Sequence, residues 1–276
     1  MKAKHLRVMF SLLILTLAAI VSVFPVFYIL AMASHGESAF TMDVGLKAFT
    51  SADLHNFRQL FLRTDFLIWL RNSVLISTVV ALVGVAMASM SGYALARFQF
   101  PGRSWILRSI LTTQMFPASM LMLPFFIVLT KLHLINSFVG LFIIYSSTAL
   151  PFCIWQMKGY FETLPRDLEE AARMDGLTSW SLFIKVILPL SLPALAITGL
   201  FSFMTSWGEY MIAAIVLQDP QLYTLPLGLK SFQASLATDW GLYAAASLIV
   251  SAPVVVLFLA LSRFLVSGLT VGSVKG

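Results

Sequence analysis

The chain has 276 residues, of which 59% are hydrophobic and 11% charged, and its mean hydropathy is +0.90. Soluble domains are roughly 45–50% apolar and about 25% charged, so this composition excludes a water-soluble globular protein. The single cysteine, Cys153, excludes an internal disulfide and a cysteine-based zinc site. We interpret the net charge of +6 as loop charge that orients a membrane protein.

Six apolar stretches follow one another along the chain. A membrane-spanning helix needs about 20 mainly apolar residues, and each stretch is about that long or longer. The pattern predicts an all-α membrane protein with a single domain, residues 1–276, and with both termini on the same side. The expected spans are residues 8–32, 72–96, 104–129, 137–157, 190–217 and 242–266.

Lysine and arginine are unevenly distributed between the two sets of loops. The loops on the side of the termini hold 11 of them and the opposite loops hold 5. Cytoplasmic loops carry the excess of such residues, so both termini are expected in the cytoplasm. A cleaved signal peptide is the alternative for the first span, but a signal core is about 7–15 residues long and this run is longer.

The motifs of common enzyme sites are absent from the sequence. It contains no G-x-x-x-x-G-K-[ST] phosphate loop, no H-E-x-x-H zinc motif and no G-x-S-x-G nucleophile turn. We therefore expect no enzyme activity, no metal and no cofactor in this chain. If ATP drives its function, another chain must hold the nucleotide.

The predicted cytoplasmic loop, residues 158–188, contains the most informative pattern. Thr163 is a candidate N-cap of a short helix, within which Glu169 and Arg173 are spaced for an i, i+4 ion pair. Gly176 stands where a left-handed residue would end that helix. Thr178 then caps a second helix that stops at Leu188-Pro189 and leads into the fifth span. The residues alone are consistent with a solvated helical hairpin and with a docking element that passes motion to the fifth span.

A resemblance favours the docking element. Glu170-Ala171-Ala172, Gly176 and Val186-Ile187-Leu188-Pro189 have the residues and spacing of the cytoplasmic loop in permease subunits of binding-protein-dependent ATP-binding-cassette importers, except that Val186 replaces isoleucine. The resemblance implies the type I importer permease fold in a bacterial inner membrane. It also implies four partners: a second homologous permease, a dimer of cytoplasmic ATP-binding subunits, an extracytoplasmic sugar-binding protein and the lipid bilayer. No nucleic acid is implied.

Other segments are similar to carbohydrate permeases of this family, and to those of maltose and maltodextrin importers in particular. The resemblance implies that the chain forms half of a maltose or maltodextrin pathway and transmits ATPase motion through residues 162–189. The alternatives are the same machine for trehalose, a glycerol phosphate or another oligosaccharide, and an ion-coupled secondary transporter. The segments are Asn56–Phe61, Asn72-Ser73, Gly92–Phe98, Phe100–Gly102, Gln114–Ala118, Lys158–Thr163, and Gly268–Thr270 with Val274–Gly276.

The resemblance also implies roles for individual residues. Some residues of the cytoplasmic loop would couple to the ATPase, the C-terminal tail would reach the ATPase dimer, and the outer loop of residues 218–241 would contact the binding protein. Glu209, the one acidic residue deep in a predicted span, is expected to face the bundle interior or the partner permease, and a proton relay is its alternative role. The coupling residues are Glu170, Ala171, Ala172, Asp175, Gly176, Leu188 and Pro189; the tail residues are Val274, Lys275 and Gly276; and the outer-loop residues are Gln233, Ser235, Asp239 and Trp240.

Overall fold

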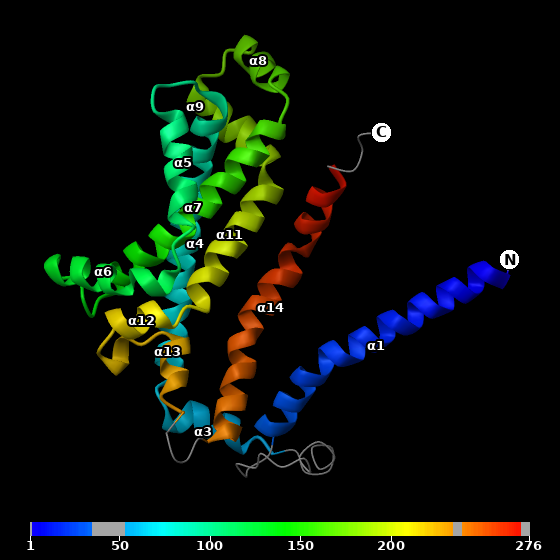
Figure 1. The fold of residues 1–276 in the computed structure, drawn as a ribbon, viewed down its shortest axis with the longest axis vertical. Coiled ribbons are helices and arrows are strands. Elements are labelled where there is room, and N and C mark those ends of the chain that lie inside the picture. Colours follow the sequence, from blue (N-terminus) through cyan, green and yellow to red (C-terminus); the bar gives the residue numbers. More distant parts are fainter. Residues whose placement is uncertain (1, 35–52, 234–238, 272–276) are drawn as a thin grey trace. The chain divides into compact units, whose positions relative to one another are not determined.

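The structure is a computed structural model that describes residues 2–34, 53–233 and 239–271 (Figure 1). Every regular element in the described residues is helical, which confirms the predicted all-α fold class. The chain divides into two compact units, Met1–Leu67 with Leu229–Ala252, and Ile68–Gly228 with Pro253–Gly276. The single domain over residues 1–276 stays a prediction.

The first unit contains α1 (Lys2–Ala33), α3 (His55–Arg63) and the beginning of α14 (Trp240–Val271). The side chains of Ala33, Ala244 and Ala245 form a small core in this unit. From Val8 to Ala33, α1 is 26 residues long, and its most apolar stretch is not buried by other parts of the protein. An apolar helix with so little protein around it is suited to contact lipid tails.

The second unit is a helical bundle built around α4 (Phe66–Arg97), α7 (Phe138–Thr163) and α11 (Leu192–Trp207). Two buried cores lie along it, one near α12 and the other beneath the loop of residues 158–188. In Figure 1 the segments α8 and α9 lie at one end of this bundle, and α12 and α13 lie toward the other end. Its remaining elements are α5 (Arg103–Thr113), α6 (Ala118–Lys131), α8 (Asp167–Met174), α9 (Ser179–Leu182), the π-helical turn η1 (Phe183–Ile187), α10 (Leu188–Leu190), α12 (Met211–Val216), the 3₁₀ turn η2 (Pro220–Leu222) and α13 (Leu225–Lys230).

Within the described residues, four helices are long and apolar enough to cross a membrane, or six if each of two bent helix pairs is one span. The bent pairs fall within the third and fifth predicted spans. The stretch 104–129 is not one straight helix, because the chain bends by 106° between α5 and α6, around Pro117. Proline has no N–H and disfavours helical geometry in the residue before it, which accounts for this break.

The fifth predicted span, residues 190–217, is also interrupted. The chain bends by 80° between the helical segment that ends at Leu190 and the helix α11. The helix α11 itself ends at Trp207. After Gly208, Glu209 and Tyr210 the chain forms the separate short helix α12.

Candidate coupling site

The helix α8 is the core of the predicted docking element, and its ends obey local rules. Acidic residues occupy its first turn, where the helix dipole favours negative charge. Its N-cap residue is Arg166, so the predicted cap at Thr163 is wrong. Thr163 is instead the last residue of α7, and its hydroxyl donates to the carbonyl of Tyr160. The preceding helix therefore continues almost to α8.

Gly176 terminates α8 as predicted. Its φ is +84°, a left-handed conformation that glycine adopts with little strain. The N–H of Leu177 donates to the carbonyl of Ala172 at 3.1 Å, and the N–H of Gly176 donates to Arg173 at 3.0 Å. This pair of hydrogen bonds is the Schellman arrangement, which satisfies the last carbonyls of the helix and turns the chain sharply.

The chain beyond Gly176 is helical but irregular. The hydroxyl of Thr178 accepts from the N–H of Ser181 at 3.3 Å, which confirms Thr178 as the cap of α9. The helix then widens into η1 and ends at Ser191, whose buried hydroxyl donates to Ile187 at 2.7 Å. Leu188 is half-buried against the core beneath the loop, and Pro189 is exposed.

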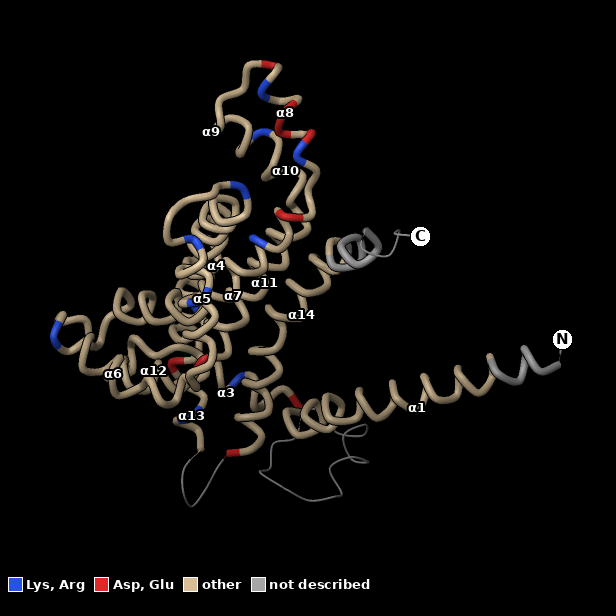
Figure 2. Tube along the Cα trace, turned by 45° about the horizontal axis from the view of Figure 1, so that its top comes forward, with Lys and Arg blue, Asp and Glu red and all other residues tan. Residues whose placement is uncertain are grey.

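The residues predicted to contact the ATPase do not all lie on one face of α8. Glu170, Ala171, Asp175 and Gly176 are exposed. Ala172 is only 6% exposed and packs into the protein's own core. Figure 2 shows that charged residues gather around α8 and the segments next to it, whereas the long helices of the bundle are largely uncharged. Charged residues are therefore concentrated at this end of the bundle.

A buried ion pair attaches the inner face of α8 to α4. The Nε of Arg97, the last residue of α4, donates to the carboxylate of Glu169, and each side chain is 8% exposed. The hydroxyl of Tyr93 donates to the same carboxylate at 3.0 Å, and a second nitrogen of Arg97 donates to the carbonyl of Leu164 at 2.9 Å. We call Tyr93, Arg97 and Glu169 the clamp. The predicted pairing of Glu169 with Arg173 is therefore wrong.

A comparison with known protein families matches most of the chain. Residues 81–271 match the family described as "Binding-protein-dependent transport system inner membrane component". The chain belongs to this family. It is a transport permease subunit of an ABC importer, not an enzyme, and the ATPase of such importers is a separate subunit. The resemblance read from the cytoplasmic loop is thus confirmed.

Several relatives are similar to this permease over most of their length. It is 33% identical to the maltodextrin transport system permease protein MdxG of Bacillus subtilis over 99% of this chain and 98% of the relative. It is 38% identical to the maltose/maltodextrin transport system permease protein MalG of Escherichia coli over 76% of this chain and 73% of the relative. In fold it resembles a chain of a bacterial ABC transporter involved in the import of the acidic polysaccharide alginate, with a TM-score of 0.78, 22% sequence identity and 95% and 98% of the two chains covered.

Glu209 of the permease lies in the break between α11 and α12, so its predicted place inside a continuous span is wrong. Its carboxylate accepts from the N–H groups of Ile212 at 2.9 Å and Ala213 at 3.2 Å, and from the hydroxyl of Tyr145 at 3.2 Å. These contacts cap the start of α12 and account for the carboxylate without a proton relay. Nearby, Phe203 and Trp207 are buried and stack on each other at 5.3 Å, which is a packing role.

Side chains at the beginning of α4 form hydrogen bonds with the loop of residues 218–241. The sequence analysis did not predict these contacts. The amide nitrogen of Asn72 donates to the carbonyls of Gln221 at 2.9 Å and Tyr223 at 3.0 Å. The indole N–H of Trp69 donates to Pro220 at 3.0 Å. Because these donors bind backbone carbonyls, they fix the path of the loop regardless of its side chains.

The predicted binding-protein contacts are only partly within the described residues. Gln233 is half-buried and accepts from the ammonium group of Lys230. Asp239 accepts from the N–H of Leu242 at 2.9 Å and so caps α14, next to the half-buried Trp240. Ser235 and the tail residues Val274, Lys275 and Gly276 lie outside the described residues.

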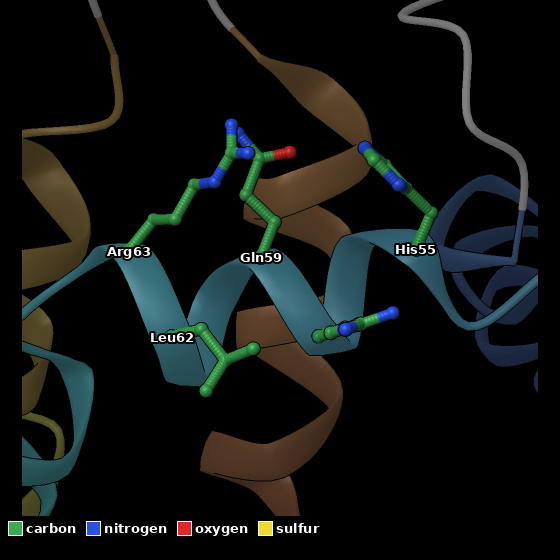
Figure 3. A pocket seen from close by; sticks show the side chains of 5 residues that line it. His55, Gln59, Leu62 and Arg63 are labelled. Carbon is green, nitrogen blue, oxygen red and sulfur yellow. The ribbon is translucent and has the colours of Figure 1, made fainter.

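A hollow of about 330 Å³ lies along α3 and is lined mainly by polar side chains (Figure 3). His55, Gln59 and Arg63 project from one side of the helix, and Leu62 projects from the other. In the sequence analysis this segment contributed to the count of loop charges and, through Asn56–Phe61, to the resemblance to carbohydrate permeases.

Proposed function

We propose that this permease is half of the translocation pathway of an ATP-driven importer of maltose or maltodextrins. The observation that carries the proposal is its similarity to MdxG, which extends over 99% of the chain at 33% identity. The MalG proteins of three further bacteria, at 38–39% identity, agree with this substrate class.

In this proposal α8 inserts into a cleft of the ATPase. Glu170, Ala171 and Asp175 are exposed and are available for that contact, and Gly176 sets the angle at which α8 is presented. Leu188 and Pro189 carry the motion into α11, and the tail at 274–276 reaches the ATPase dimer. The apolar residues Leu168 and Met174, which are 40% and 88% exposed, add contact area that water otherwise covers.

The outer loop, residues 218–241, contacts the sugar-binding protein, and both termini lie in the cytoplasm. The hydrogen bonds of Trp69 and Asn72 support this role because they hold residues 220–223 in one position. A loop that is already ordered loses less conformational freedom when it binds. A second, homologous permease completes the pathway, with two copies of the ATPase.

Another oligosaccharide is the second candidate substrate. The chain is 33% identical, over 94% of its length, to the arabinooligosaccharides transport system permease protein AraQ of Halalkalibacterium halodurans. Maltodextrins are favoured because more of the highly similar relatives are named for them.

The test is uptake by the complete transporter, assembled with its own ATPase, second permease and binding protein in sealed vesicles. Radiolabelled maltotriose should enter only with ATP on the ATPase side, and unlabelled arabinotriose should not compete. Preferential uptake of the arabinose oligomer would show that arabinooligosaccharides, and not maltodextrins, are the substrate. Uptake that needs no ATP would refute the importer itself.

Docking is tested by single cysteines at residues 168, 171 and 174 in a Cys153→Ser background. A short bifunctional crosslinker should join each of them to the ATPase in intact membranes. A cysteine at Leu132, which is 57% exposed at the end of α6, is the matched control and should give no such product. Equal crosslinking from Leu132 would contradict the proposed orientation.

A further inference from the structure

The two adjacent glutamates of α8 have opposite environments. Glu170 is exposed, whereas Glu169 is 6% exposed and bound by Arg97 and Tyr93. Successive residues of an α-helix point about 100° apart, so one helix can present one carboxylate outward and hold the other inward. The outer face of α8 is thus available to a partner, while its inner face is attached to the bundle.

The attachment lies where several helices meet. Arg97 ends α4, donates to Glu169 of α8 and also donates to Leu164, the residue that follows α7. The ring of Tyr93 packs against Phe161 of α7 at 5.6 Å and against Phe183 of η1 at 5.0 Å. A displacement of α8 therefore acts on a buried, multiply bonded contact at the end of α4.

The covalent route from α8 to α11 is less direct. It passes through the glycine turn at Gly176, the widened helix η1 and the 80° bend at Ser191. By contrast, α4, which contains Tyr93 and ends at Arg97, is one continuous helix of 32 residues. It also packs closely on α7, since a Cβ at Gly92 would lie 2.9 Å from the backbone nitrogen of Lys158. A long helix held in this way transmits displacement with little internal bending.

We propose that Arg97 and Glu169 are positioning residues that transmit the movement of the ATPase-docked α8 to α4. The inference rests on the proposed function, because it requires an ATPase to move α8. A buried ion pair is well suited to this task because its geometry is specific and because separating the charges is unfavourable. Tyr93 orients the carboxylate and strengthens the contact.

The experiment compares variants of the complete transporter in vesicles, by ATPase stimulation with sugar-loaded binding protein and by sugar transported per ATP hydrolysed. Glu169→Gln removes the charge but keeps the side-chain shape. We expect the ATPase to remain in the complex while both measures fall about tenfold, within the usual range for coupling between sites. Asp65→Asn, which alters an exposed acidic residue outside α8, is the control and should change neither measure.

The outcomes separate this inference from the proposed function. A purely structural role would lower the yield of complex and its melting temperature without changing the sugar transported per ATP. The inference is overturned if Glu169→Gln behaves like Asp65→Asn, or if it releases the ATPase from a folded permease. If Glu169→Gln does not fold, Tyr93→Phe is the deciding variant. We expect it to lower ATPase stimulation and sugar transported per ATP about threefold. No change in either measure would contradict the inference. Wild-type transport without ATP would instead refute the proposed function.

Discussion

The close packing of α4 on α7 at Gly92 leads to a quantitative prediction. In Gly92→Ala the new Cβ would lie 2.9 Å from both the backbone nitrogen of Lys158 and the Cβ of Met157, closer than such atoms normally approach. The backbone of α7 cannot yield locally, so the helices must separate, at a cost of about 1–3 kcal/mol. Gly159→Ala is the matched control because, among the described residues outside its own stretch of helix backbone, no heavy atom would lie within 4 Å of the new Cβ.

Both substitutions replace a glycine within a helix and gain the same helix propensity, about 1 kcal/mol, so the difference between them isolates the packing term. We expect Gly92→Ala to melt on the order of 5 °C below Gly159→Ala. The assay uses Cys153, the only cysteine, which is fully buried and becomes reactive to a thiol dye when the bundle opens. Equal melting temperatures would show that α4 and α7 are not in close contact at this position.

Three further predictions use the same thiol-dye assay. Gly176→Ala should lower stability by about 1 kcal/mol because alanine is strained at a φ of +84°, and Gly176→Asn should cost less; equal losses would contradict the left-handed turn. Tyr145→Phe should lower the free energy of unfolding by about 1.5–3 kcal/mol, because the carboxylate of Glu209 loses a hydrogen-bond donor. Tyr210→Phe should change it little. A larger loss in Tyr210→Phe than in Tyr145→Phe would mean that Glu209 does not accept from Tyr145. Asn72→Ala should lower the free energy of unfolding by about 2 kcal/mol and speed proteolysis near residue 221, because two hydrogen bonds to the loop are lost. An unchanged cleavage rate would mean that Asn72 does not hold the loop.

The parts of the site that depend on short-range interactions could be predicted from the sequence. The left-handed turn at Gly176 and the cap at Thr178 each involve residues within five positions along the chain. Composition also sufficed for the all-helical membrane fold, because a long apolar helix satisfies its own backbone groups. These features require no knowledge of which helices become neighbours.

The clamp could not be predicted in this way, because Arg97 and Glu169 are 72 positions apart. An exposed i, i+4 pair with Arg173 contributes only a few tenths of a kcal/mol, and burial against α4 outweighs it. A signal was nevertheless present. Tyr93 and Arg97 are four residues apart and so lie on one face of the helix, at the polar end of an apolar span, where a carboxylate is the natural partner.

Hydropathy averaged over about 20 residues does not reveal the breaks in the third and fifth spans, because a break depends on one or two residues. Pro117 supplied the signal in the third span, since it cannot donate a helical hydrogen bond. In the fifth, Gly208-Glu209 pairs a flexible residue with a side chain that caps the next helix. A charged residue within an apolar stretch is thus as consistent with a helix start as with a proton relay.

The positions of the two alanines in the Glu170-Ala171-Ala172 motif show that the motif meets two requirements at once. Ala171 is exposed, where a small side chain lets a partner approach the backbone of α8. Ala172 is 6% exposed against the protein's own core, where a larger side chain would push α8 away from α7 and strain the clamp. Because a helix separates neighbours by about 100°, a change at Ala171 acts first on the partner and a change at Ala172 acts first on the attachment of α8. If α8 docks on the ATPase as proposed, the spacing of the motif places one alanine on the surface that meets the partner and the other on the surface that meets this chain's own core.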